Sequence, residues 1–459
     1  MFVLMVVIFV LGYTAIALEH PLKVDKAASA LIIGTLCWVA YILGGESIIH
    51  LGFSPSWSTF LAENPEVHGL HAIHEFIVDY EIIHHLGEIS EILFFLLGAM
   101  TIVEMVDQHE GFKIITDKIK TTNKVKLLWI LSFLTFFMSA LLDNLTTTIV
   151  LVALLRKLID DKQTRWFFAS MVVLAANAGG AWSPIGDVTT IMLWIGGQIT
   201  AAKIIMGVFL PSLVCMVVPL AILSFTMKGN VTRPTVEEEE ENHISKGEGI
   251  LFLILGVGGL LFVPVFKTLT HLPPYMGMLL SLGVLWVVSE IKHKDKPKEV
   301  RNKLKVTAIL RRVDVPTVLF FLGILSAVAA LQSAGHLNIL AKYLDEQLGN
   351  IFLIDLAIGV LSSVVDNVPL VAGAMGMYPV HELGVTGYDA FFVQDGAFWE
   401  FLAYTAGTGG SMLIIGSAAG VAAMGLERID FIWYLKKISW LALVGYLAGA
   451  AFYYIEFGL

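Results

Sequence analysis

The stretch Ser139-Ala-Leu-Leu-Asp143-Asn144 decides the fold, because it places an acid and an amide in the middle of an apolar run. A second stretch, Ser362-Ser-Val-Val-Asp366-Asn367, repeats the pattern in the later part of the chain. A carboxylate at bilayer depth costs about 2.5–3.5 kcal/mol on insertion scales, so it is rarely placed there without a function. Two such pairs at corresponding positions predict a duplicated membrane chain with a polar site inside it.

The composition around these stretches excludes several classes of protein. Of 459 residues, 57% are hydrophobic and 15% are charged, whereas a soluble domain has about 45–50% apolar and about 25% charged residues. The formal charge of −10 gives nucleic-acid phosphates little to bind. The two cysteines, Cys37 and Cys215, lie in apolar stretches and form no readable disulfide framework. We therefore expect an all-α polytopic membrane protein rather than a soluble enzyme, a nucleic-acid binder or a disordered scaffold.

Twelve apolar segments follow one another along the chain. They cover residues 1–18, 27–46, 88–107, 127–157, 166–199, 204–227, 249–267, 275–291, 315–334, 350–378, 396–425 and 430–456. Eight have the length of one simple helical crossing, and the other four are longer and carry a polar or glycine-rich interruption. The first segment is followed, not preceded, by Lys23 and Lys26. This is the reverse of a signal peptide, so we expect a retained helix.

The positive charges predict the topology. Of the 29 Lys and Arg residues, 26 lie in six loops at 20–26, 108–126, 156–165, 228–248, 292–312 and 426–437. Such loops face the cytoplasm, which places both termini on the outer face of a cell (inner) membrane. Basic loops flank 127–157 on both sides, so this segment is expected to be a re-entrant hairpin with its tip near 142–145. By the same count 350–378 is a hairpin from the opposite face, with its tip at 366–369.

The order of these elements predicts two inverted halves, 1–228 and 249–459, joined by an acidic cytoplasmic linker at 229–248 that contains Glu237–Glu241. Each half has about five transmembrane helices, one of them broken (166–199 and 396–425), plus one re-entrant hairpin. Gly179-Gly180 and Gly409-Gly410 occupy similar places in the two broken helices. An inverted repeat with interrupted helices is typical of secondary transporters, whose site lies at the membrane midplane.

Polar side chains gather at the four interruptions. The candidate cation- and proton-binding residues are Asp143, Asn144, Thr146, Thr147, Asn177, Asp187, Thr189, Thr190, Ser362, Asp366, Asn367, Thr408 and Ser411. Carboxylate, amide, hydroxyl and freed carbonyl oxygens are the ligands of hard cations. The site holds three carboxylates (Asp143, Asp187 and Asp366, the expected Na⁺ ligands) and no Lys or Arg, which favours a cation. Competition between a proton and a metal ion for one carboxylate would couple their movements in an alternating-access site.

Further polar groups lie outside the interruptions. Glu91 and Glu104 could form a proton route or pair within the structure, and Glu88, Asp355 and Glu400 are further acids in apolar segments. In the outer loop between residues 44 and 87, His68, His71 and His74 are spaced by three. On a helix they would share a face, which permits a metal site or pH sensing. An acidic, partly helical loop is the simpler interpretation.

With these motifs in view, the chain resembles the NhaD-type sodium/proton antiporters of the ion transporter superfamily over nearly its whole length. The resemblance rests on LEHPLK (18–23), EISEILFFLLGAMTIVE (88–104), SALLDNLTTT (139–148), NAGGAWSPIGDVTT (177–190) and VDNVP (365–369). It implies exchange of external protons for internal Na⁺ or Li⁺, with no other cofactor, and a role in pH homeostasis and sodium tolerance. It also implies a homodimer, and transport by the polar residues of the tips and broken helices.

The chain departs from one pattern of the superfamily. Members that carry dicarboxylates have Ser-Asn-Thr at each hairpin tip, whereas here Asp replaces the Ser and Leu145 and Val368 follow the Asn. This argues against a dicarboxylate carrier. Another carrier of the superfamily, for arsenite, silicate or an organic anion, remains the nearest alternative. An intramembrane hydrolase that uses two aspartates, and a channel without proton coupling, are the alternatives from other classes.

Overall fold

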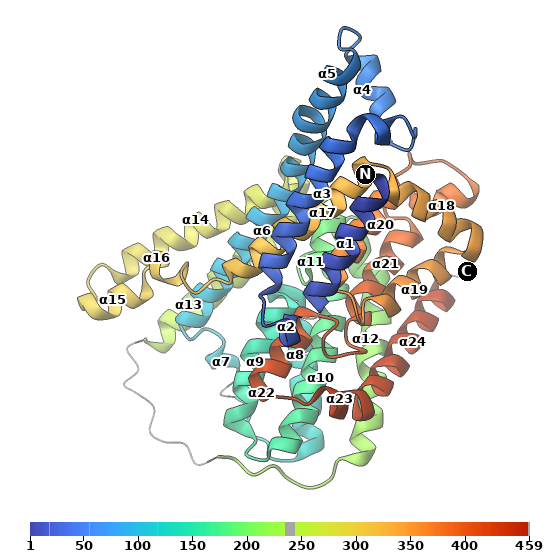
Figure 1. Cartoon of the computed structure of the whole chain (residues 1–459). Helices are drawn as coiled ribbons and strands as arrows, with labels where there is room; N and C mark the ends of the chain where they lie inside the picture. The colour runs from blue at the N-terminus through green and yellow to red at the C-terminus, as the bar shows by residue number, and fades with distance from the viewer. Residues whose placement is uncertain (18, 55, 117, 235–243, 458–459) are drawn as a thin grey trace. The chain divides into compact units, whose positions relative to one another are not determined.

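The computed structural model describes residues 1–459 except 18, 55, 117, 235–243 and 458–459 (Figure 1). The expected acidic run Glu237–Glu241 therefore lies outside the described residues. The described chain is helical and has no β-strand. It divides into two compact units, each drawn from both of the expected halves. The first unit comprises Met1–Leu93, Asp314–Ile354 and Val368–Val393, and the second comprises Phe94–Val313, Asp355–Asn367 and Gln394–Leu459.

The first unit is built on helices α1, α3 and α17, which pack against one another. Its helices are α1 (Phe2–Ala17), α2 (Glu19–Leu22), α3 (Lys26–Ile49), α4 (Trp57–Glu63), α5 (Gly69–Glu75), the π-helical turn η1 (Phe76–Ile82), α17 (Val315–Ser333), α18 (His336–Leu348) and the 3₁₀ turn η2 (Gly387–Phe392). The Trp38 indole donates to Ser326 Oγ at 3.1 Å, which ties α3 to α17. Helices α6 (Ile83–Gln108), α19 (Ile351–Leu361) and α20 (Asn367–Met377) belong to both units.

Residues 69–108 form one continuous helical stretch of 40 residues. At 1.5 Å per residue it is about 60 Å long, twice the hydrocarbon thickness of a bilayer. The sequence pattern predicted an apolar segment at 88–107 with a partly helical loop before it, whereas the helix begins at Gly69 and continues through residue 88 without a break. The helix persists because Ala72, Ile73, Phe76 and Ile77 form a buried apolar face, and α5 and η1 pack on α3.

The second unit is arranged around α10, which contacts α8, α9, α12, α21 and α22 (Figure 1). Its helices are α7 (Lys113–Thr116), α8 (Lys124–Leu142), α9 (Asn144–Leu158), α10 (Lys162–Ala181), α11 (Val188–Ile195), α12 (Ala201–Thr226), α13 (Lys246–Thr270), α14 (Pro274–His293), α15 (Lys298–Leu304), α16 (Val306–Ile309), α21 (Ala397–Gly409), α22 (Ala418–Glu427), α23 (Phe431–Lys437) and α24 (Ser439–Glu456). The central position of α10 agrees with its sequence, because it is buried without interruption from Phe168 to Ala181.

The helix lengths confirm an all-α polytopic membrane protein. Seven helical stretches within the described residues are long and apolar enough to cross a membrane, or eight if the pair α23 and α24 forms one span. That pair covers the predicted apolar segment 430–456, and the chain bends between its two helices by 49°. Shorter apolar helices include α1, α19, α20 and α22. These short helices match expected segments that are interrupted or lie at the start of the chain.

Candidate functional site

Asp143 is the single residue between helices α8 and α9. Its φ of 102° lies in a region that side chains other than glycine rarely adopt. The carboxylate caps α9, because Oδ1 accepts the Thr146 N–H at 2.7 Å and Oδ2 accepts the Thr146 hydroxyl at 2.8 Å. The chain is therefore interrupted at the residue where the sequence predicts the first tip, and this candidate acid is also a structural cap.

Asp187 occupies a similar place at the next interruption. Helix α10 ends at Ala181, the chain turns through residues 182–187, and α11 begins at Val188. Asp187 Oδ1 accepts the backbone N–H of Thr189 at 3.0 Å and its hydroxyl at 2.9 Å. The Thr190 hydroxyl donates to the Asp187 backbone carbonyl at 2.9 Å. Asp187 is only 1% exposed, so these contacts fix a carboxylate inside the protein.

Amide side chains from two further elements meet this carboxylate. Asn144, the first residue of α9, donates from Nδ2 to Asp187 Oδ2 at 2.6 Å and to Asn177 Oδ1 at 3.1 Å. Asn367, at the start of α20, points its Nδ2 at both Asp187 oxygens at 3.4 Å. Asp143 and Asp366 act electrostatically on Asp187. The three predicted aspartates therefore lie in one neighbourhood of the second unit.

Asn177 connects this group to the second broken helix. Its Nδ2 donates to Ser411 Oγ and to Ser417 Oγ, both at 2.9 Å. Ser417 also caps α22, because its Oγ accepts the Gly420 N–H. The candidate residues predicted from the sequence did not include Ser417. The spacing of the glycines could have identified it, because Gly416-Ser417 follows the second glycine pair at the same distance as Gly186-Asp187 follows the first.

Several predicted residues make other contacts. The Thr408 hydroxyl donates to the Tyr404 carbonyl of its own helix at 2.6 Å. Thr147 Oγ1 is buried and has no hydrogen-bond partner among the described residues.

Three further predicted acids lie outside the helices of these two threonines. Glu104 accepts a hydrogen bond from Gln108 Nε2 at 2.9 Å, a local contact within α6. Glu91 lies in the first unit, and Asp366 is half-buried at the end of the turn before α20.

A serine contact is repeated near the two Asp-Asn pairs. The Ser139 hydroxyl donates to the Ala176 carbonyl at 2.6 Å, and the Ser362 hydroxyl donates to the Ala406 carbonyl at 2.8 Å. Each serine lies four residues before its aspartate, and each carbonyl belongs to the alanine three residues before its glycine pair. In both places the serine ties the segment before the Asp-Asn pair to the helix that ends near the glycine pair.

The polar groups around Asp187 are directed at its carboxylate. In the part of the chain that the structure describes, the hydrogen-bond partners of this side chain are two amide N–H₂ groups, one hydroxyl and one backbone N–H, and none is Lys or Arg. The oxygens gathered nearby belong to Asp187 itself, the Thr189 hydroxyl and the Asn177 amide, and these are the oxygen types that hard cations prefer. Asp355 is a second buried acid of this unit, and neither of its oxygens has a hydrogen-bond partner among the described residues.

The outer-loop histidines do not form the metal site that their spacing permitted, which agrees with the simpler interpretation of a partly helical loop. Helix α5 begins at Gly69, so His68 lies outside it, while His71 is exposed and lies 4.0 Å from Glu75. His85 of the same unit is buried instead. It contacts Glu81 at 3.4 Å and Glu88 at 3.2 Å.

The sequence of this chain is similar to a transporter family and to several sodium/proton antiporters. Residues 2–393 match the model of the CitMHS family, described as a citrate transporter. The chain is 46% identical to sodium/proton antiporter 1 of Arabidopsis thaliana (98% of this chain, 72% of that protein). It is 44% identical to sodium/proton antiporter 2 of the same plant (98% of each). It is 29% identical to the Na⁺/H⁺ antiporter NhaD of Alkalimonas amylolytica (97% and 89%).

Proposed function

This chain belongs to the NhaD-type sodium/proton antiporters of the CitMHS family, and from that membership we propose that it exchanges Na⁺ or Li⁺ for H⁺ across the membrane. The family consists of transporters, so the expectation of a transporter rather than an enzyme is confirmed. The observation that carries the proposal is the Asp187 carboxylate, buried among Asn144, Asn177 and Asn367.

Exchange follows from competition at this carboxylate. A buried ionised carboxylate needs a compensating partner, which is either a proton or a metal ion. Na⁺ would take oxygens of Asp187 and its amide and hydroxyl neighbours, and a proton would neutralise the same group. Asp143 and Asp366 are the two further acids of the site, and their charges act on Asp187. Coupled carboxylates share protons, so the three aspartates titrate as a set.

Alternating access requires a site reached from both sides, and two inverted halves would supply it. The matched contacts of Ser139 and Ser362 support this part of the proposal, because they recur at corresponding places in the two polar motifs. In this proposal 127–157 and 350–378 are re-entrant hairpins from opposite faces. Both termini then lie outside a cell (inner) membrane, and the molecule works as a homodimer.

Anion transport is the alternative that the family description raises, since that description names citrate. A tricarboxylate needs cationic or N–H donors at its site. The donors around Asp187 are already directed at a carboxylate of the protein itself. An oxyanion or organic anion would add negative charge to this acidic neighbourhood, so cation exchange is the better fit.

The test uses the purified full-length protein in liposomes with an imposed pH gradient. Na⁺, Li⁺, K⁺ and choline are added in turn, and the gradient is followed by a pH-sensitive dye. We expect Na⁺ or Li⁺ to collapse the gradient and choline to leave it, and Asp187→Asn to abolish the response. No response of the wild-type protein to any cation between about pH 7 and 9.5 would reject cation/proton exchange. Citrate and neutral oxyacids would then be screened.

A further inference from the structure

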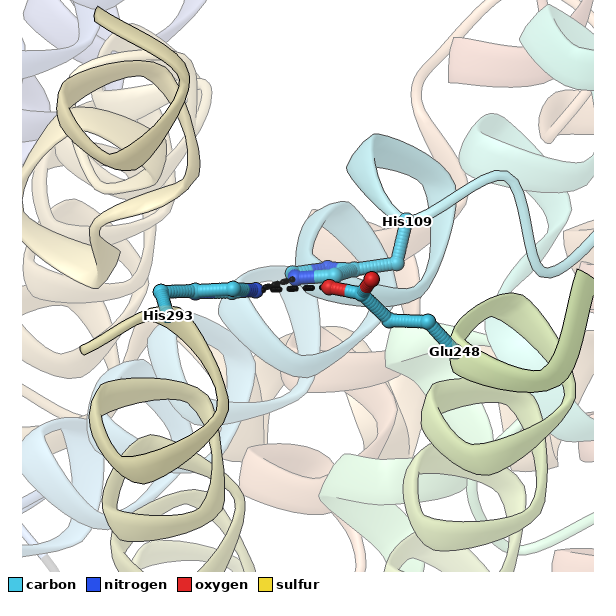
Figure 2. A group of neighbouring side chains, drawn as sticks. All are labelled: His109, Glu248 and His293. Carbon is cyan, nitrogen blue, oxygen red and sulfur yellow. Dashed lines mark hydrogen bonds and ion pairs between the residues drawn. The ribbon is translucent and has the colours of Figure 1, made fainter. Parts of the chain in front are cut away.

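His109, Glu248 and His293 bring three metal-ligating side chains together at the ends of three helices of the second unit (Figure 2). His109 directly follows α6, Glu248 lies in the first turn of α13, and His293 is the last residue of α14. Within the described ranges, no other group of three His, Cys, Asp or Glu side chains meets the spacing of a metal site. Their ligand atoms all lie within 4.8 Å of one another.

We propose that this cluster binds a divalent transition-metal ion, with Zn²⁺ as its best fit, through the Nε2 atoms of both histidines and the carboxylate of Glu248. The two Nε2 atoms are 3.1 Å apart, and His293 Nε2 lies 2.9 Å from Glu248 Oε1. Tetrahedral zinc with bonds of 2.0–2.1 Å holds its ligand atoms about 3.3 Å apart. The two printed distances are therefore within a few tenths of an ångström of this spacing, and the third ligand pair lies within 4.8 Å.

The contacts of the two Nδ1 atoms orient each imidazole ring so that its Nε2 faces the cluster. His109 Nδ1 faces the Met105 carbonyl at 2.5 Å. A carbonyl only accepts, so the ring proton lies on Nδ1 and Nε2 carries a free lone pair. His293 Nδ1 contacts Ser289 Oγ at 3.2 Å. Partners of this kind orient the imidazoles of metal sites.

Packing and burial hold the two rings in place. The ring of Phe252 stacks on His109 with a centroid distance of 3.5 Å, and the rings of His109 and His293 are nearly parallel, at 11°. Both histidines are almost fully buried, and the Glu248 side chain is 9% exposed. Without a metal, the two facing Nε2 atoms hold one proton between them in an N–H···N hydrogen bond, and a bound ion would replace that proton.

Lys296 is the competitor for the carboxylate. Its Nζ lies 2.7 Å from each Glu248 oxygen and neutralises the acid. A metal ion on Oε1 leaves Oε2 for the lysine, so the two can coexist with a weaker lysine contact. Removal of Lys296 should therefore strengthen metal binding, whereas it would only weaken a network that has no metal.

The surroundings select the kind of ion. A pocket of about 580 Å³ borders His109 and the residues beside Glu248, which gives an ion and a water ligand a way in. Four lysines line it (Lys113, Lys118, Lys120 and Lys246). They repel any divalent cation alike, so the ligand types decide the ion, and a site with only one carboxylate oxygen donor suits Ca²⁺ and Mg²⁺ poorly. Two imidazoles and one carboxylate favour zinc and its neighbours in the first transition row.

The experiment measures metal binding directly, so it does not depend on transport. The full-length protein is purified with an affinity tag that contains no histidine, treated with a chelator, and titrated with Zn²⁺ by calorimetry. Co²⁺ is added separately, because its absorption spectrum reports tetrahedral coordination. We expect one ion per chain, and binding at least about tenfold weaker in His109→Gln and His293→Gln.

Three further variants keep the outcome interpretable. His271→Asn removes an exposed histidine at the other end of α13 and should bind like the wild type. Lys296→Met should bind Zn²⁺ more tightly. Ser289→Ala leaves all three ligands in place but removes the contact to His293 Nδ1, so it should bind Zn²⁺ more weakly than the wild type. This variant still tests the proposal if a ligand variant fails to fold. The proposal is overturned if the wild type takes up no Zn²⁺, or if His109→Gln and His293→Gln, eluting as folded protein on size exclusion, bind it as the wild type does.

Discussion

At the scale of single residues, Asp143 has two roles that one substitution can separate. Its carboxylate caps α9 through Thr146, and it is one of the three acids proposed to exchange ions. Asn caps a helix as well as Asp does and has nearly the same shape, whereas Ala loses about 1 kcal/mol at a cap. We predict that Asp143→Asn melts within a few degrees of the wild type but does not exchange Na⁺ for H⁺.

The comparison needs Asp143→Ala as the matched variant. It should be both inactive and less thermostable in detergent, because cap and charge are lost together. Thermal unfolding followed by size exclusion, and the liposome assay, measure the two properties separately. Wild-type exchange by Asp143→Asn would mean that Asp143 serves only as a cap, and the proposal would then rest on Asp187 and Asp366.

Single residues of the candidate site could be predicted from the sequence, but their contacts could not. Asn144, Asn177, Asp187 and Asn367 were identifiable because each is a polar group inside an apolar run, where burial is costly without a purpose. The partners of each amide were not identifiable, since they depend on the angles between helices. His109 was missed for the same reason, because it lies far from Glu248 in the sequence and only the fold brings them together.

At the scale of helices, two glycines mark where backbones touch. A Cβ on Gly179 would overlap the Phe136 carbonyl, and a Cβ on Gly409 would overlap the Gly359 carbonyl. We predict that Gly179→Ala and Gly409→Ala each lower stability by about 1–3 kcal/mol, the cost of overpacking a filled interior. The measurement is the thermal unfolding midpoint of the purified protein.

Gly283 in α14 is the control for this prediction. Nothing lies within 4 Å of a Cβ placed there, so Gly283→Ala should be neutral or slightly stabilising, as Ala is in an open helix position. Unfolding midpoints of Gly179→Ala and Gly409→Ala that equal the midpoint of Gly283→Ala would contradict the close approach of these backbones.

Helix boundaries were less predictable than polar positions. The glycine pair Gly179-Gly180 suggested the place of the break, yet α10 runs through it to Ala181. The pair serves close packing there, and the break follows at 182–187, where Pro184 lacks an N–H donor and Asp187 starts the next helix. Glycine permits an interruption but does not require one.

At the scale of the whole molecule, composition was enough to predict the fold class, but the division of the chain was not readable. The compact units each take segments from both predicted halves. Sequence periodicity reports which face of a helix is buried, not which distant helix buries it. Long-range partners such as α3 and α17 therefore emerge only from the structure.

The last prediction concerns how the chain crosses the membrane around the first tip. Helix α8 has 19 residues, enough for about 28 Å, and could cross alone, whereas α9 has 15 residues and reaches only about 22 Å. Length therefore leaves open whether the chain crosses or returns at Asp143. The basic residues on both flanks favour return.

Cysteine labelling decides between these two paths. Lys126 and Asp160 are exposed on either side of the pair, and the native Cys37 and Cys215 are buried. We predict that Lys126→Cys and Asp160→Cys, in a background without native cysteines, are both modified from the cytoplasmic side by a membrane-impermeant maleimide. The exposed His271→Cys should be modified from outside, because one crossing separates it from the basic loop before α13. If positions 126 and 160 react from opposite sides, the segment crosses fully, and the inverted-repeat proposal fails with it.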